Sequence, residues 1–107
     1  MLRVTILYPV KPGASFDLDY YRDVHAPLAV DRLGKGTVSF TLETALRADQ
    51  LPCPRFVAVG HYLCKTWDDF LAAYLPHAKE LQDDVKNFTA IVPLIQVSHV
   101  QTYAPSG

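Results

Sequence analysis

A histidine on the apolar side of a short helix is the residue whose position most suggests chemistry. Residues 17–28, Asp-Leu-Asp-Tyr-Tyr-Arg-Asp-Val-His-Ala-Pro-Leu, are typical of an amphipathic helix interrupted by a proline. At ~100° per residue, one broad stripe collects Leu18, Tyr21, His25 and Leu28. We therefore expect His25 to face the interior, one turn after Tyr21, while Tyr20 points elsewhere.

Pro27 is expected to interrupt this helix beside the histidine. Proline has no N–H to donate, and it disfavours helical backbone angles in the residue before it, here Ala26. The sequence therefore predicts that the helix kinks or restarts next to His25, where freed backbone groups and an imidazole meet.

His25 and Tyr21 are the candidate catalytic residues. An imidazole can take and return a proton near neutral pH, as an isomerisation or a cyclisation requires. The Tyr21 hydroxyl could donate a hydrogen bond to a developing enolate or orient the imidazole. The alternatives are a core histidine with one hydrogen-bond partner and an aromatic core residue whose hydroxyl reaches the surface.

Four further residues are candidates for binding a substrate. His77 follows Pro76 and lies three residues after Tyr74, so it is expected on or beside the apolar stripe of a second helix, to which Tyr74 belongs. Leu28 lies on the same stripe as His25. His77 could equally be a boundary residue in contact with solvent. His61 shares a strand face with Val57, Val59 and Leu63, and the sequence leaves open whether that face meets the helices or a partner subunit. His99 is expected to be structural.

Other kinds of site have little support in the sequence. No pair of histidines has the spacing of two metal ligands on one element, so we expect no metal site and no cofactor. Asp83 and Asp84 are interpreted as a solvated helix end. Cys53 and Cys64 lack redox or zinc spacing, which favours reduced thiols in a cytoplasmic protein.

The charge and hydropathy patterns exclude two classes of partner. Ten Lys and Arg against eleven Asp and Glu give a net charge of −1 without a basic run, which argues against nucleic-acid binding. No apolar run approaches the ~20 residues of a membrane span. The N-terminal segment is interpreted as a first strand rather than a secretion signal.

The elements follow from periodicity and from turn residues. A single domain, 1–107, with a loose tail at 102–107, suits a chain of 107 residues. Alternation and β-branched residues predict strands at 2–8, 37–46, 55–64 and 90–100. Helical spacing predicts helices at 17–33 and 66–85, interrupted at Pro27 and Pro76. Asp17 and Thr66 are the predicted N-caps.

The order βαββαβ predicts an α+β fold of ferredoxin-like type, with a four-stranded antiparallel sheet and both helices on one face. The strands at 55–64 and 90–100 carry apolar residues on both faces, whereas a solvated face should alternate with polar residues. Because an exposed apolar face favours association, we predict a homodimer joined sheet to sheet.

Several of these segments resemble the EthD family of dimeric α+β barrel proteins. The resemblance rests on Tyr20-Tyr21, on His25 to Leu28, on Asp84 to Thr89 and on Pro93, and it covers nearly the whole chain. The family is named for a protein needed in bacterial degradation of a fuel ether. Similar barrels include lactone isomerases, cofactor-free monooxygenases and polyketide cyclases. The resemblance implies a ligand cavity between helices and sheet, lined by histidines and tyrosines.

Two functions follow as hypotheses. The first is a cofactor-independent isomerase, cyclase or oxygenase that acts on a small apolar organic compound in catabolism or secondary metabolism. The second is a non-catalytic accessory or carrier protein that binds a pathway intermediate. A dimer whose cavity is closed and whose histidines are structural is the remaining alternative, because one fold hosts many functions.

Overall fold

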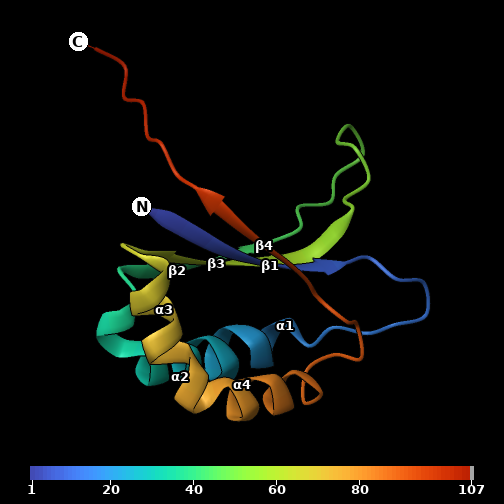
Figure 1. Cartoon of the computed structure of the whole chain (residues 1–107). Coiled ribbons are helices and arrows are strands. Elements are labelled where there is room, and N and C mark those ends of the chain that lie inside the picture. The colour runs from blue at the N-terminus through green and yellow to red at the C-terminus, as the bar shows by residue number, and fades with distance from the viewer. Residues whose placement is uncertain (107) are drawn as a thin grey trace.

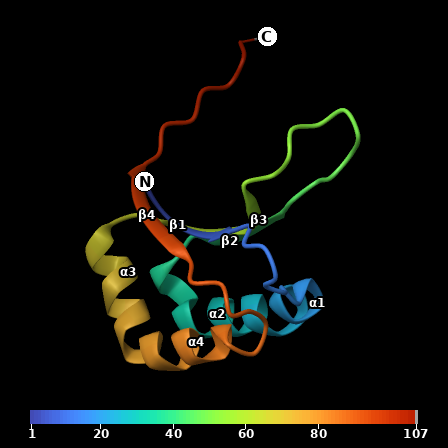
Figure 2. The same cartoon turned by 90° about the vertical axis from the view of Figure 1, so that its right-hand side faces the viewer.

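The chain folds into a four-stranded antiparallel sheet with helices on one of its faces (Figures 1 and 2). The computed structural model describes residues 1–106. Its strands are β1 (Leu2–Pro9), β2 (Ser39–Thr44), β3 (Phe56–Cys64) and β4 (Leu94–His99). They lie in the order β2-β3-β1-β4, and every neighbouring pair is antiparallel. The predicted ferredoxin-like fold is confirmed.

Two helical segments cover the sheet. The first contains α1 (Leu18–Tyr20), the π-helical turn η1 (Tyr21–His25), α2 (Ala26–Leu33) and the 3-10 turn η2 (Gly34–Gly36). The second contains α3 (Trp67–Tyr74), the 3-10 turn η3 (Leu75–His77) and α4 (Ala78–Val85).

The predicted caps position both segments. Asp17 Oδ1 accepts a hydrogen bond from the Tyr20 N–H at 3.0 Å, and Thr66 Oγ1 accepts one from the Asp69 N–H at 3.1 Å.

The prediction that Ala26 leaves the helical region is wrong. Ala26 has φ −62° and ψ −46°, and its N–H donates to the Tyr21 carbonyl across the π-helical turn. Pro27 is the second residue of α2 and directly follows the π-helical turn. The proline is therefore accommodated by a wider turn in a continuous helical segment, and that turn carries both Tyr21 and His25.

The core lies between the sheet and the helices. Antiparallel register places Val4 opposite Tyr62 and Tyr8 opposite Ala58, so these four residues share the helix-facing side of β1 and β3. They belong to two buried clusters that also include Ala29, Leu33, Cys64, Phe70, Leu81, Tyr21, Phe88 and Ile91.

Two predicted strands are shorter than expected. Strand β4 begins at Leu94, not at residue 90, because Pro93 cannot donate to a ladder and restricts the residue before it. Strand β2 spans Ser39–Thr44 within the predicted 37–46. Of the predicted tail, residues 102–106 are exposed and have no regular secondary structure, and residue 107 lies outside the described residues.

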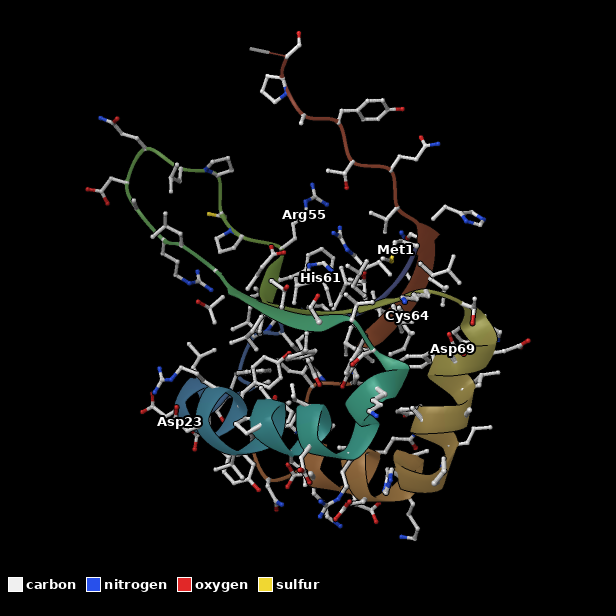
Figure 3. The ribbon with its side chains drawn as sticks, turned by 90° about the vertical axis from the view of Figure 1, so that its left-hand side faces the viewer. Met1, Asp23, Arg55, His61, Cys64 and Asp69 are labelled. Atoms are coloured by element: carbon white, nitrogen blue, oxygen red, sulfur yellow. The ribbon has the colours of Figure 1, made fainter. Side chains whose placement is uncertain are left out.

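The other face of the sheet has no helix over it. It presents the residues that alternate with the core, including Thr5, Val59, His61 and Leu63. Figure 3 shows His61 on this side, with the helices on the opposite side of the sheet. None of the helices formed by residues 1–106 has the length and hydrophobicity of a membrane span.

Candidate functional site

A cavity of about 710 Å³ lies between the sheet and the second helical segment. Its wall is mostly apolar and includes seven aromatic rings, from Tyr8, Tyr21, Phe40, Tyr62, Trp67, Phe70 and Tyr74. Leu75, Val92 and Ile95 also line it and are exposed, so the cavity opens to solvent beside them. The volume is within the range of small-molecule sites, roughly 300–1,000 Å³.

His25 lines this cavity from the end of the π-helical turn η1. Its side chain is 8% exposed, and its Nδ1 lies 2.8 Å from Asp84 Oδ2. The His25 ring stacks on the ring of Tyr21, with centroids 5.8 Å apart, and its centroid lies 4.8 Å from that of the Phe88 ring. His25 therefore faces the interior, as the apolar stripe predicts, with its orientation fixed by a carboxylate and two aromatic rings.

Asp84 lies on the last turn of α4 and is 11% exposed. Its Oδ1 accepts hydrogen bonds from the Tyr20 hydroxyl at 2.6 Å and from Asn87 Nδ2 at 2.9 Å. Burial alone would raise the pKa of Asp84, but hydrogen bonds from Tyr20, Asn87 and His25 outweigh burial and hold that pKa below its usual value. The carboxylate is therefore ionised at neutral pH.

The interpretation of both aspartates as a solvated helix end is wrong for Asp84. It holds for Asp83, which is exposed and pairs with Lys79 at 2.7 Å. The sequence does contain a signal for the burial of Asp84, which lies three residues after Leu81 and four before Phe88, both buried. At helical spacing this places Asp84 on the apolar face of α4. Tyr20 was expected to point away from the apolar stripe, and its hydroxyl donates a hydrogen bond to the same carboxylate.

The pair fixes the tautomer of the neutral imidazole. An ionised carboxylate only accepts hydrogen bonds, so Nδ1 of His25 carries the proton and Nε2 carries the lone pair. Within residues 1–106, no side-chain nitrogen or oxygen is fully buried without a hydrogen-bond partner. Nε2 makes no hydrogen bond to the described chain, so it keeps some accessible surface, and His25 is among the residues lining the cavity. This arrangement can accept a proton from a bound molecule.

Tyr21 lines the cavity, and its hydroxyl reaches strand β3. It approaches Gly60 of β3 so closely that a Cβ at Gly60 would lie 2.7 Å from it. Burial, and after it the neighbouring phenols of Tyr8 and Tyr62, raises the pKa of Tyr21. The hydroxyl is therefore neutral at physiological pH and available as a hydrogen-bond donor.

The structure brings only some of the predicted binding residues to the cavity. Tyr74 lines it, and its hydroxyl accepts a hydrogen bond from Gln82 at 2.9 Å. Leu28 packs against the adjacent core, and His77 is half-buried in η3, and neither lines the cavity. His61 lies on the opposite face of the sheet.

On that face His61 has two polar partners. Its Nε2 lies 2.6 Å from Glu43 and its Nδ1 lies 3.2 Å from Thr5. Nothing in the described part of the chain groups three or more histidines, cysteines or acidic residues at metal-binding distances.

Comparison with known proteins decides the family. The model of the EthD domain matches residues 13–91, which include His25, Asp84 and Asn87. The chain belongs to the EthD family. A search of curated proteins found no significant match.

Three solved structures, two of them of EthD proteins, share the fold. An EthD-like protein from Ralstonia eutropha JMP134 is 35% identical, with a TM-score of 0.87 over 96% of this chain and 94% of that one. An EthD family protein from Bacillus halodurans C-125 is 13% identical, with a TM-score of 0.72 over 94% and 99% of the two chains. HapK from Hahella chejuensis is 13% identical, with a TM-score of 0.59 over 100% and 99%. The last two similarities concern the fold alone.

Proposed function

We propose that the cavity binds a small, mostly apolar organic molecule and that His25 moves a proton on it without a cofactor. The observation that carries this proposal is the 2.8 Å contact between His25 Nδ1 and Asp84, which leaves Nε2 as the basic nitrogen of a residue lining an aromatic cavity. The reaction class is that of a cofactor-independent isomerase, cyclase or oxygenase.

Each residue of the pair has a distinct role in the transfer. Nε2 of His25 removes a proton from the bound molecule, and the resulting imidazolium is stabilised by the Asp84 carboxylate. Tyr20 and Asn87 hold that carboxylate in place through the same oxygen, Oδ1. The imidazolium then returns the proton to the substrate.

A generic carbon acid tests for this base directly. 5-Nitrobenzisoxazole is a small aromatic molecule in which removal of the proton on C3 of the isoxazole ring breaks the N–O bond, and the phenolate product is coloured. Binding is measured separately through quenching of Trp67, the single tryptophan, which lines the cavity. We expect His25→Ala to lower turnover by roughly 10²- to 10⁴-fold while binding persists. His99→Ala, an exposed histidine at the end of β4, is the matched control.

The competing function is a carrier that sequesters an intermediate without changing it. Wild-type protein that binds 5-nitrobenzisoxazole in the cavity but turns it over no faster than His25→Ala would support the carrier and refute the enzyme.

We also propose that the protein is a homodimer joined through the sheet face that has no helix over it. That face carries Leu7, Val57, Val59 and Leu63, which are only partly buried in the single chain. Burial against a second copy would remove this apolar surface from water. Sedimentation at micromolar concentration should give a molecular mass of twice 11.9 kDa, and a single species of 11.9 kDa would refute the dimer.

A further inference from the structure

Three tyrosine hydroxyls share the cavity with His25 and lack a partner within residues 1–106. Tyr8, Tyr21 and Tyr62 are buried and line the cavity. The hydroxyls of Tyr20 and Tyr74, by contrast, are bonded to Asp84 and Gln82. Because no side-chain nitrogen or oxygen of the described residues is both fully buried and without a hydrogen-bond partner, each of the three hydroxyls keeps some accessible surface. The site therefore holds three unused donors.

Tyr8 and Tyr62 lie on the helix-facing side of β1 and β3, and the Tyr21 hydroxyl reaches that side of β3 from the helical segment. Tyr8 of β1 is paired with Ala58 of β3, and Tyr62 lies four residues further along β3 on the same side. Gly60 lies between them, and its missing side chain admits the Tyr21 hydroxyl from the helix above. The rings of Tyr8 and Tyr21 are 5.6 Å apart.

The three phenols are neutral at physiological pH. Burial is the largest cause that raises the pKa of Tyr8, Tyr21 and Tyr62, and each is raised further by neighbouring tyrosines. Neutral phenols donate hydrogen bonds strongly to an oxygen that gains negative charge, and more so in a site of low polarity.

We propose, building on the proton transfer by His25, that these hydroxyls bind the oxygen of an enolisable carbonyl compound with an aromatic or alicyclic body. Nε2 of His25 takes the proton from the carbon next to the carbonyl group. The C–H electron pair becomes a C=C bond, and the carbonyl π pair moves to oxygen. The enolate oxygen accepts hydrogen bonds from the tyrosines, and the imidazolium returns the proton to the same carbon or to a conjugated one.

The charges around the cavity favour a neutral substrate. Lys86 is the one permanent cation among the lining residues, and it is exposed at the edge of the site. A carboxylate or phosphate bound at the tyrosines would therefore have no buried permanent cation to pair with, whereas a ketone develops its charge only in the transition state. Hydroxyls that act at that stage raise the rate of the chemical step more than they tighten binding.

Exchange of the α-protons of 2-tetralone in D₂O, followed by ¹H NMR, tests this inference. Removing one donor by Tyr8→Phe, Tyr21→Phe or Tyr62→Phe keeps the ring, and we expect exchange to slow by roughly 10²-fold in each variant. Tyr103→Phe, which alters an exposed tyrosine far along the C-terminal segment, is the matched control. Affinity for tetralin, which has the same body without the oxygen, should stay within about twofold.

The outcomes separate this inference from the proton-transfer proposal. Exchange at the wild-type rate in all three Phe variants would overturn it, and so would turnover of 5-nitrobenzisoxazole without His25-dependent exchange of 2-tetralone. Loss of His25 dependence in both assays would overturn the proton-transfer proposal as well. If a Phe variant fails to fold, Gly60→Ala displaces the Tyr21 hydroxyl with every tyrosine present, and it must slow exchange.

Discussion

Replacing Asp84 by asparagine should reverse the tautomer of His25. The Oδ1 position of Asp84 receives two donors, the Tyr20 hydroxyl at 2.6 Å and Asn87 Nδ2 at 2.9 Å. These donors would hold the amide oxygen of the new asparagine at that position. Its NH₂ group would then face His25 Nδ1, at the position now 2.8 Å away, and would donate to it. The neutral imidazole must then carry its proton on Nε2, where no lone pair is left for a substrate.

The size of the effect follows from the tautomer. The variant retains the volume of the side chain and its two hydrogen bonds from Tyr20 and Asn87, so the cavity should keep its shape. The same substitution in the Asp–His pair of a hydrolytic triad lowers turnover by roughly 10⁴. We expect a loss of roughly 10²- to 10⁴-fold in the turnover of 5-nitrobenzisoxazole, or about 3 to 5 kcal/mol of transition-state stabilisation.

A neighbouring residue provides the control. Asp83→Asn makes the same chemical change at an exposed side chain that pairs with Lys79, and it should leave turnover within about twofold. Quenching of Trp67 should show that both variants bind the probe as the wild type does. Full activity in Asp84→Asn, with folding intact, would refute the assignment of Asp84 as the residue that positions His25.

Three further predictions concern stability. Gly60→Ala should lower the free energy of unfolding in urea by about 1 to 3 kcal/mol, because its Cβ would lie 2.7 Å from the Tyr21 hydroxyl, and an unchanged midpoint would contradict this geometry. Asp17→Ala removes the N-cap of α1 and should cost about 1 kcal/mol in the same assay, whereas a cost near zero would mean that the cap is dispensable. Because the pKa of Asp84 is lowered in the folded protein, its ionised carboxylate adds stability that is fully present above the unfolded value of about 3.9. That contribution is lost as pH falls through the lowered pKa, so the advantage of wild type over Asp84→Asn should shrink in acid, and a constant difference would contradict it.

The fold was predictable because its signals are local. Alternating apolar residues locate the strands, and Asp17 and Thr66 locate the helix starts, so the order βαββαβ follows. The inward direction of His25 also follows from local spacing. The π-helical turn could not be predicted in this way, because Pro27 is compatible with either a break in the helix or a wider turn. In the structure the wider turn occurs, and Tyr21 and Phe88 pack around His25.

The partner of His25 was harder to predict because it lies 59 residues away. An aspartate beside another aspartate at a helix end has the composition of a solvated surface, and only the meeting of two helices buries one of the two. His61 illustrates the same limit. Its strand neighbours are known from the sequence, but the face that the helices cover is settled only when the whole sheet is assembled.

The role of His25 as a base is tested most directly by the long-range ¹H–¹⁵N NMR spectrum of its ring, assigned by comparison with His25→Ala. We expect the proton of the neutral ring to lie on Nδ1, bonded to Asp84, and the Nε2 resonance to shift when 2-tetralone is added. A ring protonated on Nε2 in the wild-type protein, or an Nε2 resonance unchanged by saturating 2-tetralone, would contradict this role.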